Sequence, residues 1–251
     1  ILKTLASIRY LRRIVVSLDA ANADEFALAR QAVAGIGTAE TSVVWQDGPR
    51  LQALYRRLRD QHLLDVTRGK GRACWMSSGY VLACGDCDVI AMHDADITTY
   101  DREMPARLCY PIAHPALGYE FCKGYYPRVS NGRMYGRATR LLMTPLIRSL
   151  YRIAGHLPVL VYFDSFRYIL SGEVAMLIDL ARVVRTPSDW GLEVGTLAEV
   201  YRNTSTQRIC QVGLASRFDH KHRDLSPGDQ SMGLFRMSID ICKSILRTLA
   251  G

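Results

Sequence analysis

Short apolar runs alternate with segments of helical periodicity along the first hundred residues, and this alternation limits the fold more than any other feature. The runs that predict buried strands are residues 14–18, 41–45 and 88–92. The segments that predict helices are residues 5–13, 24–34, 49–61 and 72–83. Strands alternating with helices of this length are typical of βαβ units. We therefore predict an α/β fold with a Rossmann-like, mainly parallel sheet and flanking helices.

The second half of the chain is less regular. A strand is predicted at residues 117–125, followed by a loop at 126–136 that is rich in Gly, Arg and Asn. Helices are predicted at residues 138–154, 172–182, 192–201 and 233–249, the first of them despite Pro145. Because the sequence holds no internal repeat and no Pro- or Ser-rich linker, we expect one domain over residues 1–251, with a C-terminal extension.

Composition narrows the function classes. The 251 residues contain 32 Lys and Arg against 24 Asp and Glu, a net charge of +8. Scattered arginines without interleaved aromatics argue against nucleic acid and favour small anionic substrates. No apolar run is long enough to span a bilayer, so we expect no membrane partner. Seven cysteines in apolar stretches suggest reduced thiols in the cytoplasm.

Two carboxylates follow the third apolar run directly. Asp94 and Asp96 flank Ala95 at the point where the predicted strand ends. Ligands bind at the carboxyl ends of strands in open α/β sheets, and hard Mg²⁺ or Mn²⁺ prefers carboxylate and phosphate oxygens. A capping loop has the same pattern, and a phosphatase or phosphoryl-transfer site would use the same metal. The pair indicates a metal–diphosphate site without naming the bond that breaks.

Two glycine-containing basic segments are candidate anion sites. Lys70 lies between Gly69 and Gly71, where the backbone can approach an anion, although a turn that starts a helix explains this segment better by itself. The second segment begins with Gly136 and Arg137 and leads into a predicted helix. Its backbone N–H groups, hydroxyl and guanidinium groups suit a carboxylate or phosphate, with a capped turn as the equal alternative.

A late pair of histidines, His220 and His222, follows Asp219. Histidines at i and i+2 share one side of an extended segment, so one of them can complete a metal site begun by carboxylates. A surface loop with ordinary imidazoles is the alternative. Cys84 and Cys87 have a redox-like spacing, but without a second such pair they are interpreted as core or loop thiols.

Taken in order, five motifs resemble the retaining glucosyl-3-phosphoglycerate and mannosyl-3-phosphoglycerate synthases. The motifs are Asp94-Ala95-Asp96, Gly136-Arg137-Ala138-Thr139, Leu170-Ser171-Gly172-Glu173, Trp190-Gly191-Leu192-Glu193-Val194-Gly195 and Asp219-His220-Lys221-His222. The match runs from about Leu11 to His222, and its specificity lies in the ordered set.

The resemblance implies a GT-A glycosyltransferase that needs Mg²⁺ or Mn²⁺. Such an enzyme moves glucose or mannose from a UDP-, GDP- or ADP-hexose to the 2-hydroxyl of 3-phosphoglycerate, in the synthesis of a compatible solute. Residues 1–100 would form the nucleotide-sugar half, and residues 101–251 the acceptor half with its C-terminal extension. A homodimer is the assembly considered. A GT-A transferase with another acceptor, and an inactive nucleotide-sugar- or RNA-binding module, stand as alternatives.

The resemblance also implies residue roles. The donor would contact Asp19, Lys70, Asp94, Ala95 and Asp96. The metal ligands would be Asp96 and His220, with His222 as the other candidate. The acceptor would contact Gly136, Arg137, Ala138, Thr139 and His222. The groups near the reacting sugar would be Glu193, the Leu170 carbonyl and Thr139.

Two departures from the family pattern stand out. The family begins with a strand and a nucleotide-binding loop that this chain lacks, so we expect residues to be missing ahead of Ile1. Ala138 replaces the family's valine.

For retention of the anomeric configuration, Glu193 or Glu173 could act as nucleophile beneath the anomeric carbon. We favour attack by the acceptor hydroxyl on the face that the leaving phosphate occupies.

Overall fold

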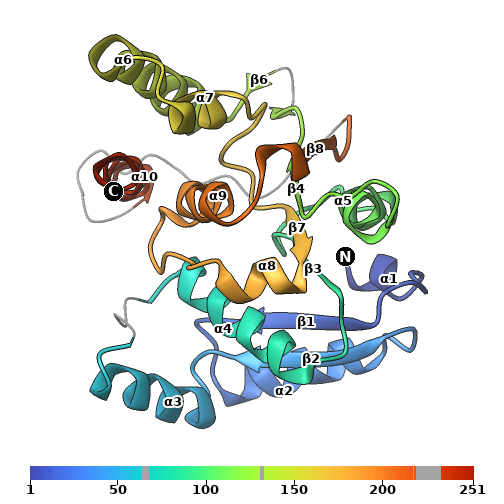
Figure 1. The fold of residues 1–251 in the computed structure, drawn as a ribbon. Coiled ribbons are helices and arrows are strands. Elements are labelled where there is room, and N and C mark those ends of the chain that lie inside the picture. Colours follow the sequence, from blue (N-terminus) through green and yellow to red (C-terminus); the bar gives the residue numbers. More distant parts are fainter. Residues whose placement is uncertain (64–67, 131–132, 217, 219–232) are drawn as a thin grey trace. The chain divides into compact units, whose positions relative to one another are not determined.

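The structure is a computed structural model that describes residues 1–63, 68–130, 133–216, 218 and 233–251 (Figure 1). The chain divides into two compact units. Unit 1 consists of residues 1–87 together with the short segment 186–189. Unit 2 consists of residues 88–185 and 190–251.

Unit 1 is built on a pair of parallel strands. Its elements are α1 (Leu2–Leu5), β1 (Arg13–Leu18), α2 (Ala23–Ala34), β2 (Glu40–Trp45), α3 (Pro49–Asp60) and α4 (Lys70–Cys84). β1 and β2 lie side by side in Figure 1, with Val16 opposite Val43. α2 packs on β2 and α4 on β1. The core between the strands and α2 centres on Ile14, Val33 and Ile36.

Local signals explain where these elements begin. Asn22 and Glu25 form a capping box at the start of α2, each side chain accepting from the other's backbone N–H. Gly48 precedes Pro49 at the start of α3, and a Cβ on Gly48 would lie only 2.7 Å from the Trp45 ring. Only glycine therefore fits between β2 and α3.

The helix predicted at residues 5–13 is wrong. α1 ends at Leu5, and β1 begins at Arg13. The Arg13 guanidinium lies 2.6 Å from the Glu40 carboxylate and 2.8 Å from that of Asp86. This ion-pair cluster holds Arg13 beside β2, a long-range constraint that helical periodicity does not reveal.

Unit 2 contains a four-stranded sheet in the order β3-β7-β4-β8. Its strands are β3 (Val89–Met92), β4 (Phe121–Tyr125), β7 (Val174–Leu177) and β8 (Ile209–Gly213), with the small hairpin β5 (Val129–Ser130) and β6 (Arg133–Met134) apart from them. Its helices are α5 (Glu103–Ala113), η1 (Ala138–Met143), α6 (Thr144–Ala154), α7 (Pro158–Asp164), α8 (Ile178–Val183), α9 (Leu192–Asn203), η2 (Thr206–Arg208) and α10 (Gly233–Ala250).

The sheet of unit 2 is mixed. β4 and β8 run parallel, but β7 is antiparallel to both of its neighbours, β3 and β4. The expectation of a mainly parallel sheet therefore fails at β7. α5 packs on β3, β4 and β7, and the core beneath it includes Met104, Leu108 and Ala175.

The predicted helix at residues 172–182 begins as a strand. Residues 174–176 are fully buried in β7, and the helix α8 starts only at Ile178. A short apolar run has the same pattern in a buried strand and in a buried helix, and its two strand neighbours decide the outcome. The elements α5, α7 and β8 were not predicted from the sequence.

The predicted helix with an internal proline is resolved by a change of helix type. Residues 138–143 form the π-helix η1, and Pro145 lies in the first turn of α6, where its missing N–H needs no acceptor.

The part of the chain that the structure describes contains no helix long and apolar enough to cross a bilayer. All seven cysteines are described, and each is a thiol.

Candidate functional site

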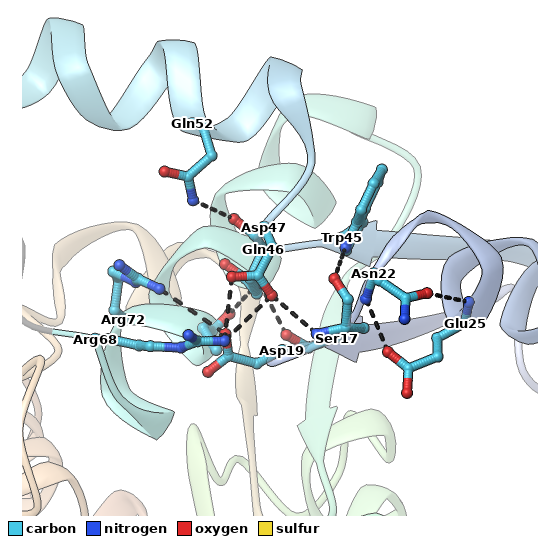
Figure 2. A network of polar contacts seen from close by, with 12 residues as sticks. Ser17, Asp19, Asn22, Glu25, Trp45, Gln46, Asp47, Gln52, Arg68 and Arg72 are labelled. Carbon is cyan, nitrogen blue, oxygen red and sulfur yellow. Dashed lines mark hydrogen bonds and ion pairs between the residues drawn. The ribbon is translucent and has the colours of Figure 1, made fainter.

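In unit 1, polar side chains gather where β1 and β2 end (Figure 2). Asp19 follows β1, Asp47 follows β2, and the guanidinium of Arg68 lies 3.1 Å from both carboxylates. Arg68 donates a hydrogen bond to Asp19, and this bond is the largest cause that raises the pKa of the Arg68 guanidinium. The carboxyl ends of two parallel strands thus share one half-exposed cation.

A buried layer supports this strand-end cluster. The Gln46 side chain is fully buried, accepts a hydrogen bond from the Tyr55 hydroxyl and donates to Ser17 Oγ at 2.9 Å. The Arg72 guanidinium lies 4.5 Å over the Tyr55 ring and 3.9 Å from Asp19. Burial raises the pKa of Tyr55, and Arg72 opposes that shift.

The sequence predicted Asp19 and Lys70 in this unit and missed the supporting residues. Asp47 comes two residues after the end of a predicted strand, much as Asp19 follows another, so that position was the available signal. Gln46, Tyr55 and Arg72 gave none, because their contacts depend on how α3 and α4 pack against the strands.

Lys70 is the first residue of α4 and is half-buried. The glycines around it have a packing reason. A Cβ on Gly71 would come within 1.8 Å of the Pro187 carbonyl oxygen, and one on Gly69 within 2.9 Å of the Ser188 oxygen. The segment 186–189 therefore lies directly against this turn, and the glycines make room for it.

In unit 2, the Asp94–Asp96 pair follows β3 as predicted. Asp94 is half-buried and Asp96 is exposed. The preceding His93 packs edge-on against Tyr100, and burial lowers its pKa to about 4, with Asp94 acting in the opposite direction. His93 is therefore neutral near pH 7, and the negative charge at the end of β3 belongs to the aspartates.

The acceptor loop predicted at Gly136 ends in η1. Gly136 has a φ of +76°, a conformation that favours glycine, and Arg137 is exposed at the helix start. Arg128, which the sequence did not single out, packs its side-chain carbons 3.5 Å from where a Gly136 Cβ would lie. It donates to the Tyr168 hydroxyl at 2.9 Å. Two arginines thus flank this loop.

The buried Tyr126 and the partly buried Tyr168 lie between β4 and the Gly136 segment in the sequence of contacts, with their ring centroids 5.2 Å apart. Burial is the largest cause that raises the pKa of Tyr126, followed by the charge of Glu173, and Asp94 adds to it. Burial also raises the pKa of Tyr168, which Arg128 and the Thr139 hydroxyl oppose. The charge of Asp94 thus acts on Tyr126, and Arg128 acts on the neighbouring Tyr168.

The remaining predicted residues of unit 2 that the structure describes lie on η1, on α9 and on the turn at Leu170. Ala138 is in the first turn of η1, and Glu193 is half-buried in the first turn of α9. Leu170 is half-buried and precedes Ser171, which is fully buried. His220 and His222 lie outside the described residues.

The donor chemistry of the aspartate pair fits a hard divalent cation, because carboxylate oxygens are the ligands that Mg²⁺ and Mn²⁺ take up. Among the described residues, no group of three His, Cys, Asp or Glu side chains is arranged to hold a metal ion. A site here would need a further ligand, and the predicted one, a histidine, belongs to the segment that is not described.

No protein-family model matches the chain. Over 250 residues, which is all of the chain and 61% of the relative, it is 51% identical to a glucosyl-3-phosphoglycerate synthase of Persephonella marina. It is 39% identical over 253 residues to the enzyme of the same name from Methanococcoides burtonii, covering 99% of the chain and 61% of the relative. The chain thus spans about three fifths of the length of these curated relatives.

The structure of glucosyl-3-phosphoglycerate synthase from Mycobacterium tuberculosis, in complex with Mn²⁺, UDP-glucose and phosphoglyceric acid, is similar to that of this chain, with a TM-score of 0.64. The match covers 94% of this chain and 68% of the other at 24% identity. That likeness confirms the expected GT-A fold. Two curated relatives of one name, at 51% and 39% identity along the chain, make it similar to the glucosyl-3-phosphoglycerate synthases.

Proposed function

We propose that the chain carries the catalytic machinery of a retaining, metal-dependent glucosyltransferase. It would move glucose from a nucleotide diphosphate sugar to the 2-hydroxyl of 3-phosphoglycerate. The observation that carries the proposal is the 51% identity to a glucosyl-3-phosphoglycerate synthase along the whole chain. The name of that relative favours glucose over mannose.

The nucleotide sugar would be held mainly by residues 1–100. In this proposal Asp19 and Lys70 contact the nucleotide, and Asp94, Ala95 and Asp96 meet its ribose and diphosphate. The exposed Asp96 would hold Mg²⁺ or Mn²⁺ together with His220. The metal would neutralise the diphosphate as it leaves. Mg²⁺ and Mn²⁺ prefer oxygen ligands, and the carboxylates of Asp94 and Asp96 supply such ligands.

The acceptor would be held by residues 101–251. Arg137 is exposed at the start of η1, and the positive φ of Gly136 turns the backbone toward that helix start. Guanidinium and backbone N–H groups suit the phosphate or carboxylate of 3-phosphoglycerate. Ala138, Thr139 and His222 complete the proposed acceptor contacts.

Retention would follow from attack by the acceptor hydroxyl on the face that the phosphate leaves. Glu193 and the Leu170 carbonyl would lie near the sugar, where positive charge develops at the anomeric carbon. The proton of the attacking hydroxyl would pass to the leaving phosphate. We place the reaction in the cytoplasm, where seven thiols would stay reduced, and we propose a homodimer as the assembly.

A donor panel tests this proposal. The purified chain is incubated with 3-phosphoglycerate, Mg²⁺ and each of UDP-, GDP- and ADP-glucose and GDP-mannose, and release of nucleoside diphosphate is measured. We expect release with at least one glucose donor, dependent on both acceptor and metal. Release of nucleoside diphosphate at the same rate without 3-phosphoglycerate, or release only with the mannose donor, would contradict the proposal.

A further inference from the structure

Unit 2 buries charged groups beside the predicted Leu170 motif. Lys123 on β4 is 1% exposed, and Glu173, directly before β7, is 0% exposed. Removing an ammonium from water costs several kcal/mol even after relaxation. An apolar side chain would fill the position at lower cost, so a buried lysine here calls for a role beyond packing.

Three hydrogen bonds of this cluster tie the turn before β7 to β4. Lys123 Nζ donates to the Ser171 carbonyl at 2.6 Å, and Ser171 Oγ donates to the Gly124 carbonyl at 2.5 Å. The Gly124 N–H donates to the Glu173 carbonyl at 2.9 Å. The paired residues of β4 and β7 end at Lys123 and Val174. The three bonds extend the contact between the two segments past that last pair.

The approach of the two segments is close. A Cβ on Gly124 would lie 2.5 Å from a methyl carbon of Leu214 and 3.1 Å from the Glu173 Cβ. A larger residue at position 124 would therefore require the Leu214 side chain to move and would crowd Glu173. The tight packing and the reciprocal bonds leave Ser171 a single position.

Ser171 is held on both sides along the backbone. Its N–H donates to the Tyr168 carbonyl at 3.2 Å, and its own carbonyl accepts from Lys123. The peptide bond is planar, so fixing the Ser171 N–H also fixes the Leu170 carbonyl, which points in the opposite direction within the same plane. The direction of the Leu170 carbonyl is therefore set by Ser171 and its partners.

We propose that Lys123 is a positioning residue for sugar transfer, which acts by holding Ser171 and thereby directing the Leu170 carbonyl. The inference rests on the proposed function, in which that carbonyl lies near the anomeric carbon. A fixed carbonyl dipole stabilises the positive charge that develops there without having to reorient during the reaction. The same carbonyl contributes little to binding the neutral ground state.

The test separates turnover from binding. Lys123→Met keeps the length and apolar stem of the side chain but removes the donor, Lys123→Gln keeps an N–H donor, and Lys243→Met on α10 changes an exposed lysine as control. We expect kcat to fall about 10- to 1,000-fold in Lys123→Met, by analogy with the loss of one oriented dipole. Donor and acceptor KM should stay within about twofold, the signature of an interaction made in the transition state.

The conservative and control variants sharpen the result. Lys123→Gln should recover part of the lost kcat, and Lys243→Met should match the parent chain. A folded Lys123→Met with unchanged kcat, or with a rise of KM that accounts for its whole defect, would overturn the proposal. If Lys123→Met does not fold, Ser171→Ala takes its place, because it removes only the hydroxyl bond to Gly124. It should lower kcat with KM unchanged.

Hydrogen exchange keeps the inference distinct from the proposed function. In Lys123→Met and Ser171→Ala, the peptide covering residues 168–176 should exchange faster, while peptides of α10 keep their rate. If the parent chain transfers no sugar from any donor, the proposed function fails and the catalytic role of Lys123 fails with it. Exchange still decides whether Lys123 holds the turn: unchanged rates in both variants would refute that step as well.

Discussion

The two units hold functional groups at strand ends by opposite means. In unit 1, Arg68 is half exposed and bridges Asp19 and Asp47. In unit 2, Lys123 and Glu173 are fully buried, and Lys123 is bonded to the backbone. Exposed ion pairs contribute about 1 kcal/mol or less and exchange partners easily, whereas buried charges are fixed by the bonds that compensate their desolvation.

Under the proposed function, the difference suits two tasks that sugar transfer requires. A nucleotide diphosphate must be bound and released in every turnover, so the charges that meet it gain from being able to change partners. Charge that develops in the transition state is stabilised best by dipoles already in place. The comparison predicts that changes in unit 1 alter donor binding, whereas changes in the buried cluster of unit 2 alter turnover.

The largest effect is expected at Asp96. Asp96→Ala should abolish transfer, because the diphosphate loses its metal anchor, and the exposed position of Asp96 should leave folding intact. Activity with Mg²⁺ and the circular dichroism spectrum are measured beside the control Asp60→Ala on α3. Turnover close to that of the parent chain would remove Asp96 from the metal site.

The two histidines give the next largest effect. His220→Ala should weaken metal-dependent activity by about 10- to 100-fold, the loss typical of a disturbed metal shell, and His222→Ala should do less. The measurement is a Mn²⁺ titration of both variants. A larger shift in His222→Ala would reverse the assignment, and no shift in either would exclude histidine.

Arg137 tests the acceptor loop. Arg137→Ala should raise the KM for 3-phosphoglycerate by about tenfold, the equivalent of roughly 1.4 kcal/mol, because one charge-assisted bond to the acceptor is lost. Donor KM should stay unchanged. Steady-state kinetics with each substrate varied in turn decide the matter, and equal weakening of both substrates would argue against an acceptor role.

Two glycines on α4 form a matched pair for stability. Gly71→Ala should destabilise the chain by about 1–3 kcal/mol, since the new Cβ would lie 1.8 Å from the Pro187 oxygen. Gly79→Ala, exposed on the same helix with no atom within 4 Å of the new Cβ, should stabilise by about 1 kcal/mol. Urea unfolding measures both, and equal shifts would contradict the packing of residues 186–189 on Gly71.

The smallest stability effect is expected at Arg68. Arg68→Ala should change the free energy of unfolding by less than about 1 kcal/mol, because its ion pairs are solvent-screened. Its donor KM should rise while kcat stays nearly constant. A loss of stability equal to that of Lys123→Met would break the contrast between the two units.

The elements of unit 1 were largely predictable, because amphipathic helices and short β-branched runs alternate clearly there. The prediction failed at residues 5–13 and at β7, where a long-range ion pair and two neighbouring strands decide the structure. The periodicity of apolar residues indicates which face of an element is buried. It does not identify contacts with residues that are distant in the sequence.

The candidate site was predictable where a motif is contiguous. Asp94 and Asp96 follow β3, and Arg137 and Thr139 open η1, as the sequence indicated. Lys123 was invisible, because a lysine in a predicted strand is normally taken as solvent-facing. It is 1% exposed and donates to the Ser171 carbonyl, a partner distant in the sequence that a strand pattern does not reveal. Gly71 was explained by a turn that starts a helix, and its packing partner Pro187, far along the chain, was not predicted.

The most direct test of the central claim is the structure of the product. The chain is supplied with an α-linked nucleotide diphosphate glucose, 3-phosphoglycerate and Mg²⁺, and the product is analysed by proton and carbon NMR. We predict a glucose α-linked to the 2-hydroxyl of 3-phosphoglycerate, formed only while the metal is present and lost with EDTA. A β-linked product, a sugar on another atom, or free glucose as the only product would contradict the account.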